Sequence, residues 1–125
     1  MKQIVIVDDQ YTTRLILSQI MLQIELPDEV NVEIFECPIK AIEWVSLNTT
    51  DLILVDFKMP TMNGQEFMKI VKTMPRFHKT PIVGMSIDDD ISLKYQFLED
   101  GAADFFLKPF DYHECMLRCK NLLTN

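Results

Sequence analysis

The sequence predicts an α/β fold built from five consecutive strand and helix pairs around a parallel sheet. Along the chain, the hydrophobic pattern switches repeatedly between short continuous apolar runs and the spacing of amphipathic helices. Continuous runs such as residues 4–7 and 52–55 are typical of strands buried on both faces of a parallel sheet. With 125 residues, 48% of them hydrophobic, the chain has the size of one compact domain spanning residues 1–125.

Five apolar segments are expected to form the strands. Asn31, Glu33 and Glu36 interrupt the second segment, which therefore predicts an edge strand. The expected strands are residues 2–7, 31–36, 51–56, 81–86 and 103–107.

A segment with helical spacing follows each strand. The expected helices are residues 11–25, 38–47, 64–74, 90–100 and 111–123. Their core-facing stripes include Leu17, Ile20, Met21 and Ile24, and Phe67, Ile70, Val71 and Met74. Pro38 suits a first helical turn, and Gly64 and Gly101 suit turns. Asp90 or Asp111 can cap the helix that follows it.

The charge balance disfavours nucleic acids and membranes as partners. The chain holds 12 Lys and Arg against 19 Asp and Glu, a net charge of -7, which opposes attraction to nucleic acid or anionic lipid. No apolar stretch approaches the roughly 20 residues of a membrane span, and residues 1–3 lead directly into a strand rather than a signal peptide. We therefore expect a cytoplasmic protein.

Three cysteines, an odd number, predict no disulfide framework. Cys115 and Cys119 lie four residues apart on an expected helix, so both are expected to be buried thiols. Their side of this helix is expected to include Tyr112, Leu122 and Leu123. A metal site that includes His113 is not predicted, because His113 points off this face and a fourth ligand is missing.

Acidic residues follow two of the predicted buried strands. Asp8 and Asp9 end the first run and Asp56 ends the third, so the three carboxylates are expected at one rim of the sheet. Carboxylates packed so closely repel one another unless a cation or a fixed lysine neutralises them. Lys108 follows the apolar run 105–107 and could supply this charge. The combination indicates a divalent cation and phosphoryl chemistry on Asp56.

Four ordered motifs carry a resemblance that runs along the whole chain. They are residues 7–9, residues 56–60 with Asn63-Gly64, residues 81–86 and residues 108–110. In type and order they resemble the receiver domains of two-component response regulators. This resemblance implies a flavodoxin-like, doubly wound five-stranded parallel sheet in the order 2-1-3-4-5, with helices on both faces.

The resemblance also assigns roles to the acids. It implies that Asp56 is the phosphoacceptor, whose carboxylate attacks the phosphorus of a phosphohistidine. It implies Mg²⁺, with Mn²⁺ as an alternative, bound directly by Asp9, largely through water by Asp8, and by Asp56 and the backbone carbonyl of Lys58. Lys108 would stabilise the charge on the transferred phosphoryl oxygens.

Two further positions resemble the switch of these domains. Ser86 would donate a hydrogen bond to a phosphoryl oxygen on Asp56, and Phe105 stands where the family has an aromatic residue that moves inward when this hydroxyl moves. Phe105 has no hydroxyl and could equally be an ordinary core residue. The resemblance also implies a cis bond between Lys108 and Pro109.

The chain departs from the family pattern around the expected site. Ile87 stands where Ala or Gly is usual, and we hypothesise that its bulk narrows access to Asp56. The Lys58 side chain could hold the acidic site or extend into solvent. Ala103 replaces an acid that is frequent in receivers that dimerise through their last two helices and fifth strand. Residues 88–90, all Asp, are expected to begin the fourth helix, where their charge suits the helix dipole.

The resemblance implies a sensor histidine kinase or a phosphotransfer protein as the partner. Docking would use the first helix, including Arg14, and the loop after Lys108. An unknown output domain or target protein would read the fourth helix, fifth strand and fifth helix of a monomer or a phosphorylation-dependent dimer. Such a domain is not an enzyme with an external substrate, because it catalyses only its own phosphorylation and dephosphorylation.

Three other functions remain as alternatives. A phosphorylation-independent interaction module would show gaps in the set of acids, hydroxyl and lysine, and this set has none. A hydrolase with an aspartyl nucleophile would carry a second Asp two residues after the first, where this chain has Lys58. A flavin-binding protein would have a phosphate loop rich in Gly, Ser and Thr where this chain has Asp8 and Asp9.

Overall fold

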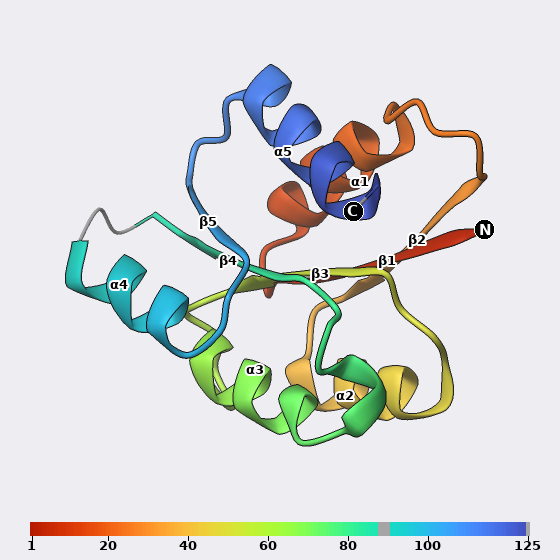
Figure 1. The fold of residues 1–125 in the computed structure, drawn as a ribbon. Coiled ribbons are helices and arrows are strands. Elements are labelled where there is room, and N and C mark those ends of the chain that lie inside the picture. Colours follow the sequence, from red (N-terminus) through yellow and green to blue (C-terminus); the bar gives the residue numbers. More distant parts are fainter. Residues whose placement is uncertain (88–90, 125) are drawn as a thin grey trace.

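The computed structural model describes residues 1–87 and 91–124 and contains a five-stranded parallel sheet in the order β2-β1-β3-β4-β5 (Figure 1). The strands are β1 (Lys2–Val7), β2 (Val30–Phe35), β3 (Leu52–Asp56), β4 (Ile82–Ser86) and β5 (Asp104–Leu107). The helices are α1 (Tyr11–Leu22), α2 (Pro38–Leu47), α3 (Gly64–Lys72), α4 (Ile91–Glu99) and α5 (Tyr112–Thr124), with a short 3-10 helix η1 (Pro75–Phe77). The predicted fold class and strand order are confirmed.

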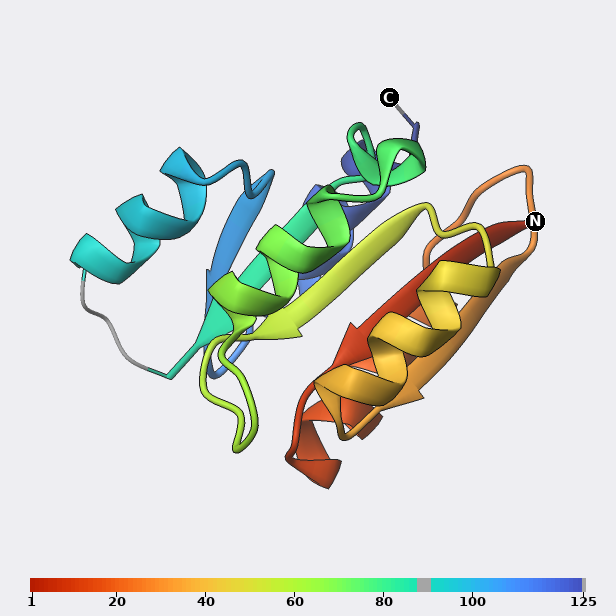
Figure 2. The ribbon, with the colours of Figure 1, turned by 90° about the horizontal axis from the view of Figure 1, so that it is seen from below.

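Helices cover both faces of the sheet and enclose two hydrophobic layers. Figure 1 shows α1 and α5 on one face, and α2 and α3 on the other. Figure 2 shows α2 in front of the β1 and β2 side of the sheet, and α4 beside β5. Side chains alternate between the layers, so that Val5 and Val7 face α2 and α3 while Ile4 and Ile6 face α1 and α5. Because β1 and β3 are buried on both faces, their ends reach the sheet rim in fixed positions.

Most of the predicted local features are confirmed. Pro38 is in the first turn of α2, and Gly101 adopts a φ of 106° after α4. The Asp111 side chain accepts a hydrogen bond of 2.9 Å from the backbone N–H of Glu114 and so caps α5. The prediction for residues 88–90 lies outside the residues that the structure describes.

Several details of the helices were predicted wrongly. Helix α1 ends at Leu22 rather than residue 25, and α3 ends at Lys72 before η1 begins. Ile70 is 38% exposed, whereas Met68, two residues earlier, is fully buried. The buried stripe of α3 is therefore shifted around the helix from the predicted one, because Met68 rather than Ile70 packs into the core.

The cysteines behave as predicted. Cys115 and Cys119 are both buried in the layer formed by α1 and α5. Leu123 is buried beside them, but Tyr112 is 43% exposed, so its expected place in the core was wrong. In the part of the chain that the structure describes, no helix has the length and apolar character needed to cross a membrane.

Candidate functional site

Three carboxylates meet at the rim where β1 and β3 end. Val7 of β1 pairs with Val55 of β3, so the residues that follow them, Asp8 and Asp56, emerge side by side. One oxygen from each of Asp8, Asp9 and Asp56 lies within 4.8 Å of the other two. Asp8 and Asp56 are buried, whereas Asp9 is exposed. The predicted acidic cluster is therefore assembled by the strand register.

Lys108 reaches this cluster from the end of β5. Its Nζ lies 2.7 Å from Asp8 Oδ2 and 3.2 Å from Asp56 Oδ1, and its side chain is only 8% exposed. The Lys108 backbone N–H donates to the carbonyl of Ser86 over 2.9 Å, and the bond to Pro109 is cis, as expected. One ammonium therefore bridges carboxylates from two strands.

Asp8 is fixed by more contacts than the sequence suggested. Its Oδ1 accepts a 2.8 Å hydrogen bond from the Gln10 N–H, while its Oδ2 faces Lys108. The guanidinium of Arg14 donates to the Asp8 carbonyl over 2.7 Å, and the Asp8 N–H donates to the carbonyl of Phe35 over 3.0 Å. Arg14, expected only as a docking residue, therefore also orders the first acidic loop.

The electrostatics of the site favour a bound cation. Burial, followed by the charge of Asp8, raises the pKa of Asp56 from 3.8 to about 6, although Lys108 opposes this rise. One lysine cannot neutralise three ionised carboxylates. A cation that prefers oxygen ligands and retains water would fit here, because Asp8, Asp9 and Asp56 offer only carboxylate oxygens and Asp9 is open to solvent.

The loop between β3 and α3 folds back tightly over the end of β3. The Gly64 N–H donates to the Phe57 carbonyl over 2.8 Å, and a Cβ at Gly64 would lie 2.5 Å from the Asp56 carbonyl oxygen. Asn63 and Glu66 form a reciprocal capping box at the start of α3. The sequence showed a turn at Asn63-Gly64, but the close approach of Gly64 to Asp56 is visible only in three dimensions.

The remaining predicted residues lie around this rim. Ser86 ends β4 with 2% of its surface exposed, and Phe105 in β5 is 7% exposed. Ile87 is 69% exposed just beyond Ser86, and Lys58 is also exposed. Nothing in these positions tests the roles expected of the four residues, so those roles remain predictions.

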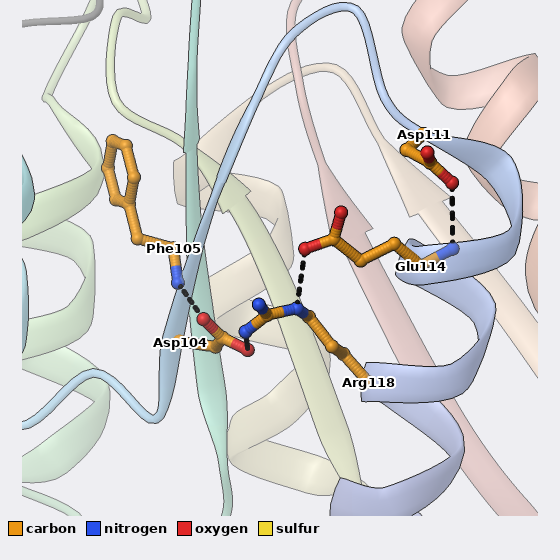
Figure 3. A network of polar contacts seen from close by, with 5 residues as sticks. All are labelled: Asp104, Phe105, Asp111, Glu114 and Arg118. Carbon is orange, nitrogen blue, oxygen red and sulfur yellow. Dashed lines mark hydrogen bonds and ion pairs between the residues drawn. The ribbon is translucent and has the colours of Figure 1, made fainter.

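A groove lies beside β5, near the rim but separate from the acids. It has a volume of about 470 Å³, and Lys94, Phe105 and Cys115 are among its lining residues. Figure 3 shows Arg118 between Asp104 and Glu114, at 3.0 and 2.9 Å. This groove occupies the surface expected to serve the output.

The comparisons with known proteins agree with this arrangement. The family model described as the response regulator receiver domain matches residues 4–120. The cyclic di-GMP phosphodiesterase response regulator RpfG of Xanthomonas campestris is 37% identical over 96% of this chain, which spans 31% of that protein. The sensor histidine kinase TmoS of Ectopseudomonas mendocina is 33% identical over 68% of this chain, with 9% of its own length matched. The chain thus spans less than a third of these two relatives.

Solved structures share the fold. A putative response regulator from Chloroflexus aurantiacus superposes with a TM-score of 0.90 and 27% identity, covering 99% of this chain and 98% of that one. The chemotaxis response regulator CheY4 of Vibrio cholerae superposes with a TM-score of 0.87, covering 98% and 99% of the two chains, at 24% identity. At that identity, the second likeness concerns the fold alone.

Proposed function

Because this chain belongs to the response regulator receiver domain family, we propose that it accepts a phosphoryl group from a histidine kinase or phosphotransfer protein on Asp56. The observation that carries the proposal is the placement of Lys108 Nζ between Asp8 and Asp56, at 2.7 and 3.2 Å. A buried ammonium shared by two carboxylates is suited to an added anionic group at Asp56.

In the proposed reaction, a carboxylate oxygen of Asp56 is the nucleophile. It forms a bond to phosphorus while the bond from phosphorus to the donor's imidazole nitrogen breaks, and that nitrogen keeps the electron pair. A general base is unnecessary because the nucleophile is already ionised. Lys108 and the hydroxyl of Ser86 would then stabilise the phosphoryl oxygens.

The donor set fits Mg²⁺, with Mn²⁺ as the alternative. Asp8, Asp9 and Asp56 would hold the ion together with the carbonyl of Lys58. When bound, such an ion would neutralise charge on the acids and on the transferred phosphoryl oxygens. The proximity of the three carboxylate oxygens, within 4.8 Å, supports this proposal.

We expect the domain to act as a signalling module in the cytoplasm rather than as an enzyme with an external substrate. Ser86 and Phe105 would transmit the phosphorylation state to the surface formed by α4, β5 and α5. An output domain or target protein would bind there, to a monomer or to a phosphorylation-dependent dimer. Ala103, directly before β5, argues against a dimer that needs an acid at this position.

The proposal can be tested by phosphorylation in vitro. The protein would be incubated with acetyl phosphate with and without Mg²⁺, and its intact mass measured for wild type, Asp56→Asn and the surface control Asp100→Asn. We expect one phosphoryl adduct on wild type and on Asp100→Asn, only with Mg²⁺, and none on Asp56→Asn.

Two outcomes would contradict the proposal. An adduct that persists in Asp56→Asn would place the chemistry elsewhere. If wild type forms no adduct with acetyl phosphate or a kinase, and also fails to bind beryllofluoride, a phosphorylation-independent interaction module becomes the better description.

A further inference from the structure

A glycine stands in the middle of a fully buried central strand. Gly84 in β4 pairs with Val55 on one side and Phe105 on the other. Glycine weakens a strand interior and is found where another group approaches closely. A Cβ at Gly84 would lie 3.0 Å from Phe105 Cδ2 and 3.0 Å from Phe97 Cδ1. Two aromatic rings therefore fill the space that a side chain at residue 84 would need.

Phe97 is the central ring of this cluster. It comes from α4, is fully buried, and lies 5.5 Å from the Phe105 ring and 5.7 Å from the Phe57 ring. A Cβ at Gly64 would lie 3.0 Å from Phe97 Cζ. Phe97 is thus enclosed by two glycines and two rings, and Phe57 directly follows Asp56 in the chain. These contacts connect α4 to the loop that carries the acid.

Phe105 differs from Phe97 because it is also among the residues that line the groove beside β5. It belongs to the edge strand β5 and lines the groove of about 470 Å³. Figure 3 shows its side chain and that of Asp104 pointing away from each other across β5. A bulkier residue at position 84 would push against both rings. Phe97 is fully buried, whereas Phe105 borders the groove, so we expect Phe105 to be the ring that is displaced. The buried position of Phe105 therefore depends on the missing side chain of Gly84.

We propose that Gly84 and Phe97 are positioning residues that hold Phe105 in its buried position before Asp56 is phosphorylated, which keeps the groove open to an output partner. This inference rests on the proposed function, since it concerns the coupling between Asp56 and Phe105. Apolar burial and the tilted ring pair with Phe97 favour the buried position.

The proposal has a thermodynamic consequence at Asp56. If buried Phe105 is the position coupled to a phosphorylated Asp56, a chain already in that position binds a phosphoryl analogue without first rearranging. Shifting Phe105 outward reduces the fraction of competent molecules and weakens the apparent affinity by the same factor. Gly84 touches neither Asp56 nor Lys108 in any described contact, so an effect on affinity would act through the rings.

The experiment measures the apparent dissociation constant of beryllofluoride at saturating Mg²⁺ by isothermal titration calorimetry. We expect Gly84→Val to raise it about tenfold, corresponding to a competent fraction of about one tenth. Adding Phe97→Leu should return Gly84→Val to within about threefold of wild type, because the shorter side chain makes room for the valine and for Phe105. The matched control is Val45→Ala, a truncation in the same hydrophobic layer at α2, whose affinity should stay within about twofold.

The outcomes separate this inference from the proposed function. A wild type that binds no beryllofluoride would overturn both. A wild type that binds, together with a folded Gly84→Val that binds equally well, would overturn the inference alone. So would equal weakening in Val45→Ala, or a lack of rescue by Phe97→Leu. If Gly84→Val does not fold, Gly84→Ala, which asks the rings to move by only a few tenths of an ångström, should weaken binding about threefold, and unchanged affinity would count against the inference.

Discussion

Asp56 combines burial with the charge of neighbouring acids. Burial and Asp8 raise its pKa to about 6, against 3.8 for the ordinary group. The folded chain therefore holds a proton on Asp56 more tightly than the unfolded chain does. At neutral pH, ionised Asp56 is repelled by the carboxylates of Asp8 and Asp9, and Lys108 or a bound cation reduces this repulsion.

This raised pKa predicts a pH dependence of stability without metal. Since the folded pKa exceeds the unfolded one, the contribution of Asp56 to the free energy of unfolding grows as the pH falls from 7.5 through 6 toward 4. Relative to Asp56→Asn, which cannot titrate, wild type should gain about 1 kcal/mol between pH 7.5 and pH 5. Urea unfolding in EDTA measures both proteins, and a difference that is independent of pH would contradict the prediction.

The position of Ile87 predicts an effect on the rates at which Asp56 is phosphorylated and dephosphorylated. It follows Ser86 directly and is 69% exposed, so truncating it should leave the fold intact. If its bulk screens Asp56, Ile87→Ala should speed phosphorylation by acetyl phosphate severalfold and shorten the phosphoryl lifetime. Intact mass followed over time gives both rates, and Ile91→Ala is the control, because Ile91 is 61% exposed. Unchanged rates in Ile87→Ala would contradict the hypothesis that Ile87 narrows access to Asp56.

At the scale of elements, Lys72 joins the end of α3 to the start of β4. Its ammonium donates hydrogen bonds to the carbonyls of Phe77, His78 and Thr80, at 3.1, 3.3 and 2.8 Å. Burial lowers the pKa of this lysine. These three carbonyls lie in and after η1, between α3 and β4. The Phe77 carbonyl also accepts a 3.2 Å hydrogen bond from the Thr80 N–H, whereas Lys72 is the described donor to the carbonyls of His78 and Thr80.

Removing the Lys72 hydrogen bonds should lower the stability of the domain without affecting the phosphorylation of Asp56. Lys72→Met keeps most of the apolar stem but removes a donor from three carbonyls. The Phe77 carbonyl keeps the Thr80 N–H, whereas those of His78 and Thr80 lose their described donor, so the free energy of unfolding should fall by about 2 kcal/mol. Lys69→Met is the control, because Lys69 is 63% exposed and makes only a 3.7 Å ion pair with Asp100, and should change stability by less than about 0.5 kcal/mol. Urea unfolding compares the two, and equal effects would refute a role for the carbonyl contacts.

At the scale of the whole molecule, Lys108 ties the two halves of the sheet together at the acidic rim. It follows the edge strand β5 and reaches Asp8 after β1 and Asp56 at the end of β3, with β4 between. A bound cation and this ammonium neutralise the same carboxylates. The stability of the sheet rim is therefore linked to metal binding.

This link predicts a variant that depends more strongly on metal. Lys108→Met should lower the free energy of unfolding in EDTA at pH 7.5 by about 3 kcal/mol, because it leaves two buried carboxylates without their cation. Mg²⁺ should then raise the melting temperature of Lys108→Met more than that of wild type. Lys79→Met, at an exposed lysine in the turn before β4, is the control for loss of positive charge. An equal or smaller response to Mg²⁺ in Lys108→Met would contradict the linkage.

The sequence by itself determined the architecture and which residues form the acidic cluster with its lysine. Continuous apolar runs identified buried parallel strands, and acids directly after them had to reach one rim because parallel strands end at the same edge. Asp8, Asp9, Asp56 and Lys108 could therefore be assigned to a cluster before any coordinates were known.

Only the tertiary structure decided the contacts between distant segments. How the helices pack on the sheet decides three features. These are the hydrogen bond from Arg14 to the Asp8 carbonyl, the exposure of Ile70 on α3, and the packing of Phe97 against Gly84. Hydrophobic periodicity predicts the buried face of a helix only approximately. The position of the Phe97 ring depends instead on Gly84, a neighbour in another element that has no side chain. The site follows from local sequence because strand ends define it, but its coupling to α4 follows from packing.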